Sequence, residues 1–192
     1  MAKINFKKGL TDIVLYIIIF IVVQIFLTYA GAGIWAAVKG EGYQATLLAM
    51  GTGNNAILTA LTTVFSNVIT LIIFLKAKWT PLTRNYLQSK PWISLLWVAL
   101  FTLGAIIPLE FVYEQIGVEM DANTERVFAS LMKEPWGYVA IGILAPLAEE
   151  FVFRGAILRT LLDMVSKKNH WVAIFISAAV FGLIHGNKAQ FI

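Results

Sequence analysis

Three charged residues lie close together inside an otherwise apolar stretch of the chain. Glu149, Glu150 and Arg154 fall within six residues of a run that has the composition of a membrane helix. A charge at the bilayer centre costs at least about 2.5 to 3.5 kcal/mol, and such residues usually mark functional sites. Glu150 and Arg154 are four residues apart, so they can form an ion pair on one helix face. Glu149 is rotated by about 100° and needs a partner from another helix or from water.

The next apolar run offers such a partner in His185, which follows Phe181 by about one helical turn. If the two runs form an antiparallel pair that turns within residues 163–170, positions equidistant from the turn lie at equal depth. Glu149 and His185 are each 18 residues from Lys167, or about 27 Å along a helix. We therefore expect both side chains in one layer. Pro146 frees a backbone carbonyl there and favours a hydrated pocket.

A carboxylate and an imidazole that face the same water are typical of general-base hydrolysis. Glu149 would accept a proton from the water, while His185 would hold the water or stabilise developing charge. Arg154 would be the counter-ion of Glu150, and Phe181 would form an apolar wall. The structural alternative is that these polar residues only hold helices together.

The elements that must position these residues are membrane helices. Of the 192 residues 59% are hydrophobic and 14% are charged, against roughly 25% charged residues in soluble domains. The sequence predicts an all-α polytopic membrane helix bundle in one integral-membrane domain, residues 1–192. We also expect a turn at 51–55 and a short interfacial helix within 121–134. The five apolar segments are residues 11–36, 57–76, 92–113, 136–162 and 171–186.

Basic residues predict the orientation of this bundle. With the N-terminus in the cytoplasm, 11 of the 15 Lys and Arg residues lie inside, as the positive-inside rule favours. The first apolar run could also be a signal peptide, but it continues past the small residues 30–32, which favours an uncleaved helix. The absence of cysteine excludes thiolate nucleophiles and disulfides. The modest net charge of +4 gives no reason to expect a nucleic-acid partner.

The order Glu149-Glu150-x-x-x-Arg154, then Phe181-x-x-x-His185 on the next membrane helix, resembles a known family. These are like the first two motifs of the CAAX-prenyl-protease and bacteriocin-processing family of intramembrane endopeptidases. The resemblance covers about residues 136–192, and the first three helices match only in general character. It implies that Glu149 activates water, that His185 acts at the same water and that Glu150 with Arg154 supports them. It also implies a bacterial plasma membrane and a membrane-anchored or prenylated CAAX-type substrate.

The sequence departs from the family in one respect. Members carry a further membrane helix with a second catalytic histidine and an asparagine four residues later, whereas this sequence ends at Ile192. His170 lies in the polar turn and cannot substitute. We therefore expect the C-terminal helices of the family fold to be missing, because the sequence is either a fragment or a truncated, inactive relative.

Two questions stay open at this stage, the cofactor and the class of function. A divalent metal such as zinc is compatible with the family resemblance, but the residues do not demand one. The alternatives to a protease are a non-catalytic immunity or scaffolding protein that binds a peptide, and a transporter in which the carboxylates couple ions.

Overall fold

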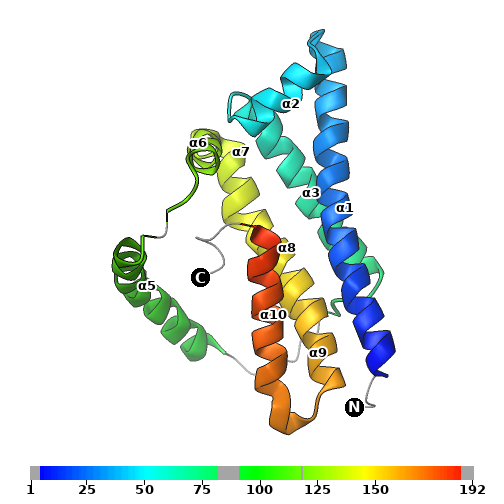
Figure 1. The fold of residues 1–192 in the computed structure, drawn as a ribbon, viewed down its shortest axis with the longest axis vertical. Coiled ribbons are helices and arrows are strands. Elements are labelled where there is room, and N and C mark those ends of the chain that lie inside the picture. Colours follow the sequence, from blue (N-terminus) through cyan, green and yellow to red (C-terminus); the bar gives the residue numbers. More distant parts are fainter. Residues whose placement is uncertain (1–4, 82–90, 118, 187–192) are drawn as a thin grey trace.

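The computed structural model describes residues 5–81, 91–117 and 119–186 and shows a bundle of helices (Figure 1). Within these ranges every regular element is helical, which confirms the predicted all-α class. The elements are α1 (Phe6–Lys39), α2 (Tyr43–Gly51), α3 (Ala56–Lys76), α5 (Trp92–Gln115), α6 (Ala122–Leu131), α7 (Pro135–Gly137), η1 (Tyr138–Leu144), α8 (Ala145–Glu149), η2 (Glu150–Leu158), α9 (Arg159–Met164), η3 (Lys167–Asn169) and α10 (His170–His185).

Among the described residues, three helices are long and apolar enough to cross a membrane. α1, α3 and α5 have 34, 21 and 24 residues, with mean hydropathies of 2.7, 2.1 and 2.1 in their most apolar windows. They confirm the first three predicted segments, although α1 extends beyond the predicted one at both ends. α10, the fifth segment, has 16 residues, so its length of about 24 Å is shorter than the roughly 30 Å hydrocarbon core. The chain is a helical integral membrane protein.

The fourth predicted segment, residues 136–162, is helical but is not one uninterrupted α-helix. Two π-helical stretches, η1 and η2, flank the five residues of α8. Pro146, near the start of α8, has no amide hydrogen and cannot continue the ladder of α-helical hydrogen bonds. This gives a local reason for the wider turns of η1.

The second π-helical stretch is held from outside by two hydroxyl groups. Thr80, which follows α3, donates from Oγ1 to the backbone carbonyl of Phe151 at 2.7 Å. Ser177 of α10 donates to the carbonyl of Phe153 at 3.4 Å. Gly155 permits the approach of Thr80, because a Cβ at this position would collide with the methyl group of Thr80. Neighbouring elements therefore fix η2 directly beside Glu149.

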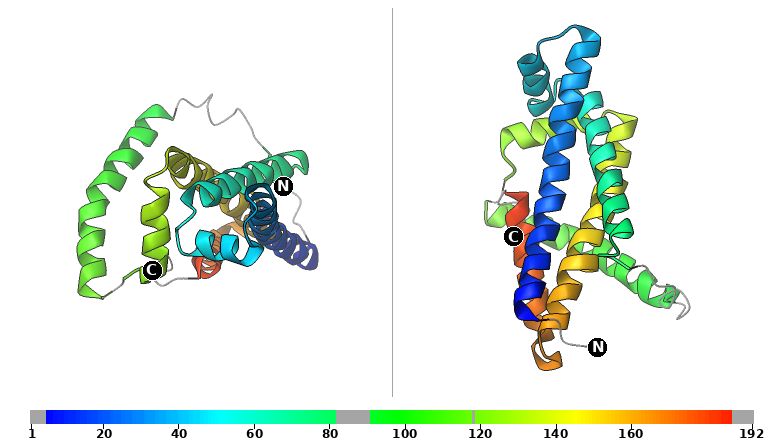
Figure 2. Two further views of the ribbon diagram at one scale, coloured as in Figure 1. Left: turned by 90° about the horizontal axis from the view of Figure 1, so that it is seen from above. Right: turned by 90° about the vertical axis from the view of Figure 1, so that its right-hand side faces the viewer.

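The hydrophobic core lies where α1, α3, η2, α9 and α10 meet. Views along two further directions show α1 and α3 beside the run of helices from α7 to α9, with α10 against the lower part of that run (Figure 2). In contrast, α5 has no buried residue among those described and lies apart from the other helices (Figures 1 and 2). The buried residues of this cluster are Ile13, Tyr16, Phe74, Val152, Phe153, Ala156, Ile157, Leu161 and Ala173.

The connecting segments confirm two further predictions and add one helix. Residues 52–55 form a turn, and α6 is the short helix expected within 121–134. α2 was not predicted, because its nine residues carry no clear amphipathic pattern. Four basic residues in the orientation count lie outside the described residues, as does the C-terminal stretch 187–192. They are Lys3, Arg84, Lys90 and Lys188.

Candidate functional site

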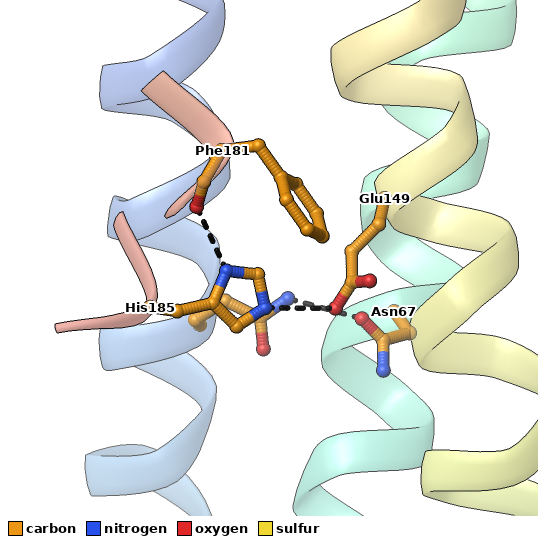
Figure 3. Close-up of polar contacts among 5 residues, drawn as sticks. Asn67, Glu149, Phe181 and His185 are labelled. Carbon is orange, nitrogen blue, oxygen red and sulfur yellow. Dashed lines mark hydrogen bonds and ion pairs between the residues drawn. The ribbon is translucent and has the colours of Figure 1, made fainter. Parts of the chain in front are cut away.

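Glu149 and His185 lie on two different helices, and their side chains face each other. Glu149 is the last residue of α8 and His185 is the last residue of α10. Their closest side-chain atoms, Glu149 Oε1 and His185 Nε2, are 3.7 Å apart, and the two side chains are 28% and 18% exposed (Figure 3). The polar turn between the helices contains η3, which begins at Lys167. The structure thus places the two residues in the common layer expected from their equal distance to this turn.

The hydrogen bond on the other side of the imidazole determines which nitrogen carries a proton. His185 Nδ1 lies 2.8 Å from the backbone carbonyl oxygen of Phe181 (Figure 3). A carbonyl oxygen only accepts, so we assign the proton of the neutral ring to Nδ1. The Nε2 atom that faces Glu149 is then a bare acceptor. Two acceptors at this separation require a proton or a donor between them, and a water about 2.8 Å from each atom fits the gap.

Glu150 and Arg154 form the ion pair predicted from their spacing. Both side chains are at least about half exposed on the surface of the described residues. Among the described residues Arg154 is paired with Glu150, while the one charged or titratable partner of Glu149 within ion-pair distance is His185. The contribution of the Glu150–Arg154 pair is to allow two charges to lie in an apolar helix at a lower cost than either charge alone.

Phe181 forms an aromatic wall next to the imidazole. The centroids of its ring and the His185 ring are 4.4 Å apart, and Phe153 contacts it edge to face at 4.9 Å. Phe20 of α1 extends the row with an edge-to-face contact to Phe153 at 6.1 Å. These contacts restrict the rotation of Phe181 and shield one side of His185 from water.

Glu149 borders two cavities on different sides of its helix. The first has a volume of about 380 Å³ and lies between α8, η2 and α10, with Glu150, Arg154 and Phe181 in its wall. The second has a volume of about 330 Å³ and lies between α8, α10, α1 and α3. His185 lines the second cavity together with Glu149. Both cavities are large enough to admit several waters or part of a peptide chain.

The second cavity also contains polar residues that the sequence reasoning missed. Ser66 of α3 donates to the side-chain carbonyl of Gln24 on α1 at 2.6 Å, and the amide nitrogen of Gln24 donates to Asn67 Oδ1 at 3.2 Å. Antiparallel counting places them within about one helical turn of the same depth, since Gln24 lies 15 residues before the last residue of α1 and Asn67 lies 11 residues after the first residue of α3. Gln24 and Asn67 line the same cavity as Glu149 and His185.

A metal site would need more ligands than this pair supplies. Catalytic zinc sites have three protein ligands. In the described part of the chain no three His, Cys, Asp or Glu side chains gather closely enough to hold a metal ion. Glu149 and His185 provide two donors, which do not fit a zinc site by themselves. The chemistry that these two residues can perform together is the polarisation of a water molecule.

Comparison with known proteins gives three findings. Residues 131–192 match the family described as Type II CAAX prenyl endopeptidase Rce1-like, which includes the region 136–192 that carried the resemblance. A Bacillus subtilis (strain 168) protein named "Putative membrane peptidase YdiL" is 26% identical over 126 residues, or 62% of this chain and 50% of that protein. The chain therefore spans about half the length of this curated relative. No solved structure gives a significant match.

Proposed function

We propose, from the match of residues 131–192 to the Rce1-like family of type II CAAX prenyl endopeptidases, that this protein contributes the water-activating part of an intramembrane endopeptidase. The observation that carries the proposal is the 3.7 Å approach of Glu149 Oε1 to His185 Nε2 at the border of a cavity. A membrane peptidase relative and the family match support the same class of activity.

The proposed reaction is direct hydrolysis of a peptide bond by one water. Glu149 and neutral His185 both act as acceptors, so a water between them donates one O–H to each. The lone pairs of its oxygen are then free to attack the scissile carbonyl carbon. Glu149 takes the proton as the C–O bond forms, and it returns this proton to the amine nitrogen as the C–N bond breaks. The products are a carboxyl group and an amine, and no covalent enzyme intermediate is formed.

The proposed substrate is a peptide segment at or in the membrane. Both cavities have largely apolar walls, and they lie in a bundle of membrane helices. A membrane-anchored tail, including a prenylated CAAX-type tail, fits this setting, and the cavity volumes match a few residues of extended chain. We propose that the membrane is the plasma membrane of a bacterium. We also propose a cytoplasmic N-terminus, because most of the basic residues then lie inside.

The test is proteolysis by the protein expressed from its full natural reading frame and purified in detergent. Membrane-anchored and prenylated peptides would be offered to wild type, Glu149→Gln and His185→Gln, with products identified by mass spectrometry. We expect both variants to lose cleavage by about 100-fold or more, as for loss of a general base. The control is Glu110→Gln on α5, a carboxylate outside both cavities. Cleavage that persists in Glu149→Gln refutes the mechanism, and peptide binding without cleavage by wild type favours a non-catalytic protein.

A further inference from the structure

The second cavity has one wall formed by α1 and α3. On this wall the amide groups of Gln24 and Asn67 form a polar patch. Ser66 and Asn67 are only 1% and 3% exposed, in a helix otherwise suited to the bilayer. Asn67 of α3, Glu149 and His185 appear together in the close-up view and line one cavity (Figure 3). Polar side chains in membrane helices can serve only to hold helices together. A purely structural pair has no need to line the cavity that also contains Glu149 and His185, as this pair does.

The direction of the hydrogen bonds shows what this patch can still bind. The Ser66 hydroxyl donates to Gln24 Oε1, and Gln24 Nε2 donates one N–H to Asn67 Oδ1. One N–H of Gln24 and both N–H groups of Asn67 have no further side-chain partner among the described residues. The patch therefore has a surplus of donors, and a ligand that satisfies it must be an acceptor such as a carbonyl oxygen.

Charge narrows the choice of ligand. Among the described residues that line this cavity, Glu149 is the one acidic group, and none is Lys or Arg. A free carboxylate would meet the charge of Glu149 with no cation to offset it, at high cost in a membrane interior. A peptide carbonyl is neutral and matches amide donors. The remaining lining, Phe20, Ile21, Ile25 and Ile184 among others, suits an apolar side chain.

We propose that the Gln24–Asn67 amide pair binds the carbonyl oxygen of the substrate peptide in this cavity and stabilises the negative charge that develops on it during attack by the water. The inference rests on the proposed function and adds a substrate-binding role for residues of α1 and α3. Neutral donors held by fixed hydrogen bonds are suited to such charge, because they need no reorganisation when it forms. Ser66 is the positioning residue, since it orients the Gln24 amide.

The test compares a carbonyl and a thiocarbonyl at the scissile position of one cleavable peptide. The enzymes are wild type, Gln24→Leu and Asn67→Leu, with the full natural chain in detergent. Sulfur is a weak acceptor, so wild type should prefer the carbonyl substrate. Removing a donor should lower kcat on the carbonyl substrate by about 100-fold and should reduce the ratio of carbonyl to thiocarbonyl rates by about tenfold. The control is Thr70→Val, which removes a buried hydroxyl one helical turn along α3 and outside the cavity.

Each outcome bears on one proposal. Equal losses on the two substrates, or an unchanged kcat, overturn the role of the amide pair while leaving the protease intact. Absence of cleavage by wild type instead refutes the proposed function. If the leucine variants do not fold, Gln24→Asn keeps an amide on α1 but withdraws it by one methylene. This variant must show the same reduced rate ratio, and a wild-type ratio in it overturns the inference.

Discussion

The packing of Thr80 against Gly155 gives a sharp prediction for a single added methyl group. In Gly155→Ala the new Cβ would meet the methyl group of Thr80 first, and then its hydroxyl and Cβ. Thr80 is 7% exposed and donates to the Phe151 carbonyl, so it has little room to move. The added methyl group must therefore displace Thr80 or push η2 away from it. Either movement strains the segment that begins directly after Glu149.

The magnitude follows from a matched pair of glycines in the same helical run. Gly142 in η1 has open space where a Cβ would lie, so Gly142→Ala gains only the helical preference of alanine, about 0.5 to 1 kcal/mol. Gly155→Ala gains a similar amount but overpacks the site, which costs about 1 to 3 kcal/mol. The helical preference of alanine is about the same in both variants, so it cancels from the difference in their stability. Gly142→Ala should therefore be more stable than Gly155→Ala by the packing cost, about 1 to 3 kcal/mol.

Equilibrium unfolding in mixed micelles measures this difference, and Thr80→Ser supplies the rescue. Serine keeps the hydroxyl that binds the Phe151 carbonyl and removes the methyl group that collides first. The double variant Gly155→Ala/Thr80→Ser should recover part of the lost stability, as a positive coupling in the double-mutant cycle, because the shortest of the three contacts is removed. If Gly155→Ala is as stable as Gly142→Ala, or if Thr80→Ser gives no recovery, the proposed packing of η2 is wrong.

Two further predictions concern charged groups. Glu150→Gln and Arg154→Met should each destabilise the protein by leaving one charge unpaired, and the double variant should lose less than the sum by about 1 kcal/mol; additive losses in the same unfolding assay would show that the ion pair contributes nothing. Hydrogen bonds from the Thr124 hydroxyl and backbone N–H hold the pKa of Asp121 below its usual range. This cap of α6 should therefore be fully effective above the unfolded value of about 3.9 and weaken as the pH falls through the folded pKa. Amide exchange at 122–125, corrected for intrinsic rates, should rise at low pH in wild type but not in Asp121→Ser, and an identical rise in both would contradict the assignment.

Hydropathy predicted the long apolar helices, and antiparallel counting predicted the common depth of Glu149 and His185. Apolar runs identified α1, α3 and α5 because a membrane span needs about 20 apolar residues regardless of their order. Counting from Lys167 brought Glu149 and His185 to one level, since two antiparallel helices have the same rise per residue. The catalytic roles of these two residues stay predictions until proteolysis is measured.

The local hydrogen-bond patterns of the helices could not be predicted from the sequence. The π-helical turns of η1 and η2 depend on which carbonyl each amide selects, and Thr80, which donates to one of these carbonyls, is 71 positions from Phe151. Hydropathy contains no signal for such a choice. The pairing of Gln24 with Asn67 was missed for a different reason. Gln24 lies in a strongly apolar run, and Asn67 lies among Ser66 and several threonines of α3, so hydropathy marks neither residue and only their similar depth connects them.

The π-helical stretches on both sides of α8 have a consequence for the angular phase of the site. A regular α-helix turns by about 100° per residue, whereas a π-helical turn takes an additional residue into the circuit. The direction of Glu149 is therefore set by how many residues η1 and η2 contain, seven and nine, as much as by any contact of its side chain. Deleting one residue from η2 would remove an additional residue, so a regular α-helix could form with α9 close to its present phase relative to Glu149, whereas a deletion from a regular α-helix turns the two flanks by about 100°. The direction of the Glu149 carboxylate relative to α9 therefore depends on both the number of residues in η2 and the type of helix that they form.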